Sequence, residues 1–208
     1  MSIHNPFCPP FTPMVDVLPE TQVGDFAVEH FTVNRGDVTL NMFHQQPRLW
    51  EGRYARLMGP KGLLMSDTGY ERLTNFSFVS KAHGHVLIGG LGLGMILLPI
   101  LNRLEVLSVR VVELESGVIE LVEPLLRNHL SKRANRKLKI YQGDIRTYEP
   151  IEGLDETYHT VYFDIWPEVR DRYYGEIKYL RRRWGQFLRG TKAWIEAWER
   201  KEMRNLAR

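Results

Sequence analysis

The chain has 208 residues, of which 43% are hydrophobic and 25% are charged, proportions that exclude a chain disordered throughout. The longest apolar stretch, residues 86–101, is interrupted by glycines and a proline and is too short for a membrane span. We therefore expect no membrane association and a cytoplasmic location. The single Cys8 excludes an internal disulfide, and a net charge of +3 is too small to indicate nucleic-acid binding by itself.

The first third of the chain predicts a loop, a small β region and a helix. Residues 1–22 contain five prolines and are predicted to be loop. Short stretches rich in β-branched and aromatic residues follow, and Gly59-Pro-Lys-Gly62 separates two of them as a turn. We predict an antiparallel β region over about 23–66, with strands at 26–33, 38–43, 53–58 and 62–65. Asp67 or Thr68 is expected to cap a helix that ends near Lys81.

From residue 85 the pattern changes to strands that alternate with helices. Strands are predicted at 85–90, 107–114, 138–142, 158–165 and 193–198, and helices at 95–104, 116–130 and 169–188. Pro99 is expected in the first turns of its helix, or to kink it. This alternation predicts an α/β fold with a Rossmann-like, doubly wound, mostly parallel sheet. We divide the chain into an N-terminal loop and β region, 1–66, and a Rossmann-like domain, 67–208.

A glycine loop follows the first of these strands. Ile88-Gly-Gly-Leu-Gly-Leu-Gly-Met95 comes directly after the strand and opens a helix, where a tight turn lets backbone approach a ligand. Glu113 ends the next strand, 19 residues after Gly94, where a carboxylate can accept bonds from both hydroxyls of a ribose. Loop, strand and acid together predict a nucleoside-cofactor site. The alternative is a packing turn beside a solvated glutamate.

Two further acidic residues follow later strands. Asp144 comes after the third strand, in Gln142-Gly-Asp-Ile145, and Asp164 ends the fourth, in Tyr162-Phe-Asp-Ile-Trp-Pro167. Carboxyl ends of parallel strands meet at one edge of a sheet, where ligands bind in doubly wound folds. We therefore expect these carboxylates at one site.

These segments resemble the class I S-adenosylmethionine-dependent methyltransferase superfamily over residues 85–167. They are most similar to its spermidine-synthase-like branch, through residues 86–94, 112–121 and 143–144. The segment 163–167 also resembles the Asp-containing segment of small-molecule N-methyltransferases such as guanidinoacetate methyltransferase. The usual sheet of this superfamily has further strands at its end, and we expect the last ones to be lacking here. The missing wall of the acceptor pocket would then come from residues 1–66 or from a partner subunit, or would be absent altogether.

The resemblance implies S-adenosylmethionine as cofactor and assigns residues to it. It implies that the methionine part lies at Gly90, Gly92 and Gly94, the ribose at Glu113 with Leu114 beside it, and the adenine at Asp144 and Ile145.

Asp164 is the predicted catalytic residue, and the resemblance places it beside the cofactor as well. In both resembled families this position faces the attacking amine, and a carboxylate can orient an ammonium and take its proton. Trp166 is predicted to wall the acceptor pocket and to stack on a cation, with plain packing as the alternative. Asp67, Tyr70 and Glu71 are candidates for contact with the acceptor, because an element here closes over the cofactor in the resembled families. An ordinary helix cap is the alternative for them.

The sequence thus predicts methyl transfer to a small molecule, with an amine or guanidine nitrogen as the acceptor. Aminopropyl transfer is the first alternative, although the second Asp that polyamine synthases place shortly after the first is absent. A non-catalytic protein that binds S-adenosylmethionine is the second. A nucleic-acid methyltransferase is disfavoured, because residues 163–167 lack the proline pair common in enzymes that methylate base amino groups.

The C-terminal part of the chain is basic, which raises the question of which partners it binds. Residues 168–208 contain twelve lysines and arginines and six acidic residues, so the preceding part carries a net charge of −3. The basic and aromatic stretch 178–184 fits a solvated helix face better than a nucleic-acid interface. Trp194 and Trp198 are typical of interfaces, and a homodimer is one arrangement that would cover them. His83 and His85 lack further ligands in the sequence, so no metal is expected.

Overall fold

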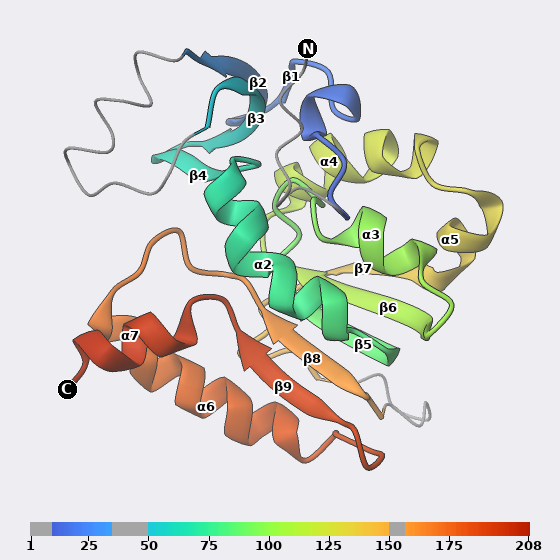
Figure 1. Ribbon diagram of the computed structural model, residues 1–208, viewed down its shortest axis with the longest axis vertical. Coiled ribbons are helices and arrows are strands. Elements are labelled where there is room, and N and C mark those ends of the chain that lie inside the picture. The colour runs from blue at the N-terminus through green and yellow to red at the C-terminus, as the bar shows by residue number, and fades with distance from the viewer. Residues whose placement is uncertain (1–9, 35–49, 150–156) are drawn as a thin grey trace.

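Two β-sheets organise the protein. The computed structural model describes residues 10–34, 50–149 and 157–208. In this part, one sheet has four strands in the order β1-β2-β3-β4, and the other has five in the order β7-β6-β5-β8-β9. Figure 1 shows the first sheet above the carboxyl ends of β8 and β9, with α2 running from β4 down along the parallel sheet.

The antiparallel sheet confirms the predicted β region. Its strands are β1 (Thr21–Val23), β2 (Phe26–Val33), β3 (Gly52–Gly59) and β4 (Gly62–Ser66). The turn between β3 and β4 needs glycine, because Gly62 has a φ of +105°. The expected strand 38–43 lies outside the described residues. The prediction of loop for residues 1–22 was wrong at β1, because pairing with β2 across the turn at Gly24 makes this short segment a strand.

The second sheet is parallel throughout and has Rossmann-like topology. Its strands are β5 (Gly84–Gly89), β6 (Val106–Glu113), β7 (Leu138–Gln142), β8 (Thr160–Phe163) and β9 (Trp194–Ala197). The chain builds outward from β5 to β6 and β7, then returns to place β8 on the other side of β5. The order therefore reverses between β5 and β8, and ligands bind at such a reversal in open α/β sheets. The predicted fold class is confirmed.

Helices connect and cover the strands. The longer ones are α2 (Gly69–Lys81), α4 (Ser116–Asn128) and α6 (Tyr174–Gly185), and the shorter ones are α3 (Leu97–Asn102), α5 (Lys132–Lys137) and α7 (Arg200–Leu206). Single turns, η1 (Met14–Asp16) and η2 (Asp171–Tyr173), precede β1 and α6. Pro99 lies in the first turn of α3, as expected, so it removes no bond from the helix interior. No described helix has the length and apolarity that crossing a membrane requires.

One hydrophobic core joins the two sheets. The centre of β5 is fully buried, and the stacked rings of Phe78 and Tyr162, 4.1 Å apart, fix α2 against β8. Met14 and Leu57 from the N-terminal region belong to the same buried cluster. The boundary drawn between residues 66 and 67 stays a prediction.

Candidate functional site

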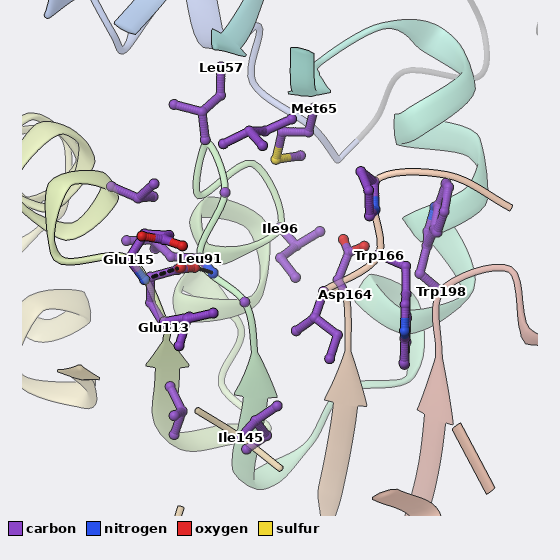
Figure 2. A pocket seen from close by; sticks show the side chains of 18 of the residues that line it. Leu57, Met65, Leu91, Ile96, Glu113, Glu115, Ile145, Asp164, Trp166 and Trp198 are labelled. Carbon is purple, nitrogen blue, oxygen red and sulfur yellow. Dashed lines mark hydrogen bonds between the residues drawn. The ribbon is translucent and has the colours of Figure 1, made fainter. Parts of the chain in front are cut away.

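A cavity of about 250 Å³ opens at the carboxyl ends of β5, β6 and β8. The glycine loop after β5 lines it, and β3 and β4 of the antiparallel sheet close it from above. Figure 2 shows Glu113 beyond the end of β6 and Asp164 beyond the end of β8, with Leu91 and Ile96 between them. We call the two halves of this cavity the Glu113 end and the Asp164 end.

The glycine loop fits closely against both neighbouring walls. Gly90 and Gly92 line the cavity with φ values of +97° and +51°, which side chains rarely adopt. A Cβ on Gly90 would lie 2.2 Å from the carbonyl oxygen of Asp164, and one on Gly92 would lie 2.1 Å from the Met65 sulfur. Gly94, with φ +72°, is not among the cavity residues and faces Leu126 instead. Only the first two predicted glycines therefore meet the cavity.

Glu113 is buried at the end of β6, and the glycine loop holds its carboxylate. One oxygen accepts the Leu91 backbone N–H at 2.7 Å, and the other accepts the Glu115 backbone N–H at 2.9 Å. Burial raises the pKa of Glu113, and these backbone bonds act in the opposite direction. The Leu114 backbone N–H is a third donor to this carboxylate, so the backbone fixes its orientation at the end of β6. Leu114, the next predicted residue, is half-exposed and also lines the cavity.

Asp144 and Ile145 lie together on the side of the Glu113 end next to β7, as the sequence predicted for one edge of the sheet. One oxygen of Asp144 accepts the Arg146 backbone N–H at 2.9 Å and the Arg146 guanidinium at 3.1 Å. Ile145 is buried against Gly89, where a Cβ would come within 2.9 Å of it. The pair therefore combines a carboxylate with an apolar surface.

Asp164 follows β8, and its backbone N–H is bonded to the Gly89 carbonyl at 2.9 Å. The Asn75 side chain bonds its carboxylate, and the Asn75 carbonyl oxygen in turn accepts the Tyr162 hydroxyl at 2.9 Å. Desolvation raises the pKa of Asp164 to about 7, and the bond to Asn75 partly opposes that rise. A carboxylate with this pKa is well suited to exchange a proton near neutral pH.

Of the three residues predicted in α2 and its cap, only Glu71 reaches the cavity. Burial raises the pKa of Glu71 to about 8, with repulsion from Asp164 and Glu199 as further causes. Tyr70 is bonded to Glu199 instead, and burial together with this acidic neighbour raises its pKa to about 12. Tyr70, which was predicted to contact an acceptor, is therefore not among the residues that line the cavity.

Asp67 lies away from the cavity and is fully buried. Its carboxylate accepts the backbone N–H groups of Met14 and Ala55 at 2.6 and 2.7 Å, and pairs with Arg72 at 2.7 Å. These contacts tie η1, β3 and α2 together. Neither Asp67 nor Thr68, the residue that precedes α2, makes a side-chain capping bond to the helix.

Two tryptophans wall the Asp164 end. Trp166 and Trp198 are each 5% exposed, and Figure 2 shows both beside Asp164. The Trp166 ring N–H donates to Glu176 at 2.5 Å, and that of Trp198 donates to Thr74 at 3.0 Å. Trp166 was predicted here. Trp198 was predicted as a possible contact with a partner chain, which stays a prediction, and its place in this cavity was not predicted.

The apolar wall opposite comes from the antiparallel sheet. Leu57, Leu64 and Met65 line the cavity, and the Met65 sulfur accepts the Leu93 backbone N–H at 3.1 Å. Residues 1–66 thus supply a wall for which the sequence left two sources open. Asn75 was not predicted as a site residue. An asparagine within a helix gives no sign in the sequence that it is fully buried beside a carboxylate.

The residues of the Glu113 end fit a nucleoside. A buried carboxylate that the backbone fixes in place suits the hydroxyls of a ribose, and Ile145, Leu91 and Val112 offer apolar surface to a flat base. The histidines His83 and His85 lie at the opposite edge of the sheet, and no cluster of metal-ligating side chains occurs within residues 10–34, 50–149 and 157–208.

No protein-family profile matches this chain, and no curated protein matches it in sequence. Several solved structures of methyltransferases are similar to part of this chain. CcbJ methyltransferase from Streptomyces caelestis is 18% identical, with a TM-score of 0.40 over 56% of this chain and 46% of that one. The Podospora anserina methyltransferase PaMTH1, solved with S-adenosylhomocysteine, is 14% identical, with a TM-score of 0.43 over 64% and 53%. Mitomycin 7-O-methyltransferase MmcR is 12% identical, with a TM-score of 0.44 over 62% and 37%. The chain thus covers about half or less of the length of these proteins.

Proposed function

We propose that this protein transfers a methyl group from S-adenosylmethionine to an amine or guanidine nitrogen of a small molecule. The observation that carries the proposal is a single cavity with two different ends. The Glu113 end fits a nucleoside, and the Asp164 end holds a pair of carboxylates, Asp164 and Glu71, together with two tryptophans. Anionic groups with aromatic walls favour a cationic ligand.

At the Glu113 end, we assign the ribose hydroxyls to Glu113 and the adenine to Asp144 and Ile145. Gly90 and Gly92 leave their backbone open toward the remainder of the cofactor. When bound, S-adenosylmethionine supplies a methyl group on a positively charged sulfur.

At the Asp164 end, the two carboxylates differ in their proton affinity. With a pKa of about 8, Glu71 is mostly protonated at neutral pH, whereas Asp164, with a pKa of about 7, is close to half ionised. The pair therefore carries roughly half a negative charge at neutral pH, and a cationic acceptor would favour its ionised form. Asp164 orients the ammonium and takes a proton from it, which exposes the nitrogen lone pair. Trp166 and Trp198 exclude water from this end.

Calorimetry tests the cofactor half of the proposal. S-Adenosylmethionine and S-adenosylhomocysteine are expected to bind the wild-type protein, and Glu113→Ala should lose this binding. Glu120→Ala, an exposed glutamate in α4, is the matched control and should bind as the wild type does. Binding of NAD in place of both sulfur nucleosides would contradict the assignment.

A methyl-transfer screen over amines, guanidines and short RNA tests the acceptor half. Asp164→Asn should bind the cofactor but show no turnover with any acceptor that the wild type methylates. Decarboxylated S-adenosylmethionine with putrescine, run in parallel, tests aminopropyl transfer. Turnover retained in Asp164→Asn would remove Asp164 from the proposed role, and cofactor binding without any turnover would favour a non-catalytic binding protein.

A further inference from the structure

Outside the cavity, a series of charged and polar contacts connects its two ends. Arg146 donates from its Nε to one oxygen of Glu176 at 2.5 Å, and from Nη1 to Asp144 at 3.1 Å. The other oxygen of Glu176 accepts the ring N–H of Trp166, also at 2.5 Å. The order of contacts is therefore Asp144, Arg146, Glu176, Trp166.

The members of this series come from separate elements. Asp144 and Arg146 follow β7 and line the cavity, and Trp166 follows β8 and lines its other end. Glu176 belongs to α6 and is not among the cavity residues, so it joins two walls without lining the cavity itself.

The chemistry of the contacts makes Glu176 hard to replace. An arginine guanidinium and a tryptophan ring N–H are donors only, so each needs an acceptor. Glu176 supplies one oxygen to each of them. The side-chain bond to Glu176 is also the largest cause of the raised pKa of Arg146, in line with a strong charge-assisted bond.

We propose that Glu176 is a positioning residue that couples the two ends, so that a ligand which fixes Asp144 and Arg146 also fixes Trp166. This inference rests on the proposed function, because it takes the Glu113 end as the cofactor site and Trp166 as a wall of the acceptor site. Coupling of this kind is reciprocal: cofactor binding orders the acceptor wall, and an ordered wall tightens cofactor binding.

The test follows the ring N–H resonance of Trp166 by ¹H–¹⁵N NMR, with S-adenosylhomocysteine as the probe. The chain has five tryptophans, and Trp166→Phe identifies the resonance by its loss. In the wild type, the probe should shift this resonance. Glu176→Gln retains a single acceptor oxygen, so the resonance should lose its response to the probe, and the dissociation constant of the probe should rise about threefold to tenfold.

Two further variants sharpen the result. Arg146→Gln keeps the bond between Trp166 and Glu176, so the resonance of the free protein should stay in place while its response is lost. Glu149→Gln is the matched control, because Glu149 also pairs with α6, through Arg183 at 2.8 Å, but does not reach Trp166. It should leave both the response and the affinity unchanged.

The outcomes separate the two proposals. If the wild type does not bind S-adenosylhomocysteine in calorimetry, the proposed function fails and the coupling fails with it. If the wild type binds it but the Trp166 resonance does not respond, the coupling alone is overturned. The coupling is also overturned if Glu176→Gln responds as the wild type does, because the shift then arises from direct contact.

Discussion

Asn75 shows how a single buried amide sets the chemistry of its neighbour. Its side chain bonds the carboxylate of Asp164, and Tyr162 holds it in place through a hydroxyl donated at 2.9 Å. A hydrogen bond to the charged form favours that form, so Asn75 keeps the pKa of Asp164 lower than burial alone would make it.

Replacement of Asn75 by alanine is therefore expected to raise the pKa of Asp164. If Asp164 takes the proton, the acidic limb of the pH profile of kcat/KM, near pH 7 in the wild type, should move up by about one unit. Tyr162→Phe is the comparison, because it keeps the Asn75 amide and removes only the hydroxyl that orients it, so it should move the limb less. Equal shifts in the two variants would contradict this assignment.

Asp67 shows the opposite case, a carboxylate whose contacts are with the protein itself. It was predicted to touch the acceptor, but it accepts two backbone N–H groups and pairs with Arg72, all without exposure to solvent.

Asp67→Ala should lower the free energy of unfolding by about 3–5 kcal/mol, because it breaks a buried ion pair and removes the acceptor of two buried N–H groups. Urea denaturation followed by circular dichroism measures this. Glu29→Gln breaks an exposed pair with Arg56 and should cost less than about 1 kcal/mol. Similar losses in the two variants would argue against the structural role of Asp67.

Among the elements, the glycine loop and β8 depend on one another. The absence of a side chain at Gly90 lets the carbonyl of Asp164 approach the loop, and the backbone of Asp164 is bonded to Gly89 from the other side. The glycine loop therefore positions Asp164 and also lines the Glu113 end of the cavity.

Gly90→Ala should lower the stability by about 2 kcal/mol or more, because the residue has a φ of +97° and the new Cβ would lie 2.2 Å from a backbone oxygen. Gly175→Ala is a matched change within α6, where a Cβ meets open space. It should raise the stability by about 0.5–1 kcal/mol. Thermal unfolding of both variants checks the contrast, and a neutral Gly90→Ala would contradict it.

At the level of the whole molecule, the buried carboxylates of the Asp164 end lower the stability of the protein at neutral and higher pH. Glu71 ionises near pH 4.5 when unfolded, but its folded pKa is about 8. The folded state therefore binds the proton more tightly, and stability falls as the pH rises from about 4.5 to about 8.

Glu71→Gln removes this dependence. The variant should be more stable than the wild type at pH 8, by roughly 1–3 kcal/mol, and should have no such advantage at pH 4. Urea denaturation across this pH range measures the difference. Glu120→Gln, on the exposed face of α4, should change stability by less than about 0.5 kcal/mol. A Glu71→Gln advantage that does not grow with pH would contradict the assignment.

The sequence by itself determined the alternation of strands and helices, the glycine loop, and the carboxylates Glu113, Asp144 and Asp164 at one sheet edge. It could do so because the pattern of each strand is local and the order of strands along the chain is read directly from the sequence. Parallel strands then bring their carboxyl ends together. Only the tertiary structure decided which nearby polar residues reach the cavity. Asp67, Tyr70 and Glu71 are close in sequence, yet only Glu71 lines it. Long-range packing decided this, as it did for Asn75 and Trp198, because the direction and burial of a side chain depend on contacts that no local pattern contains.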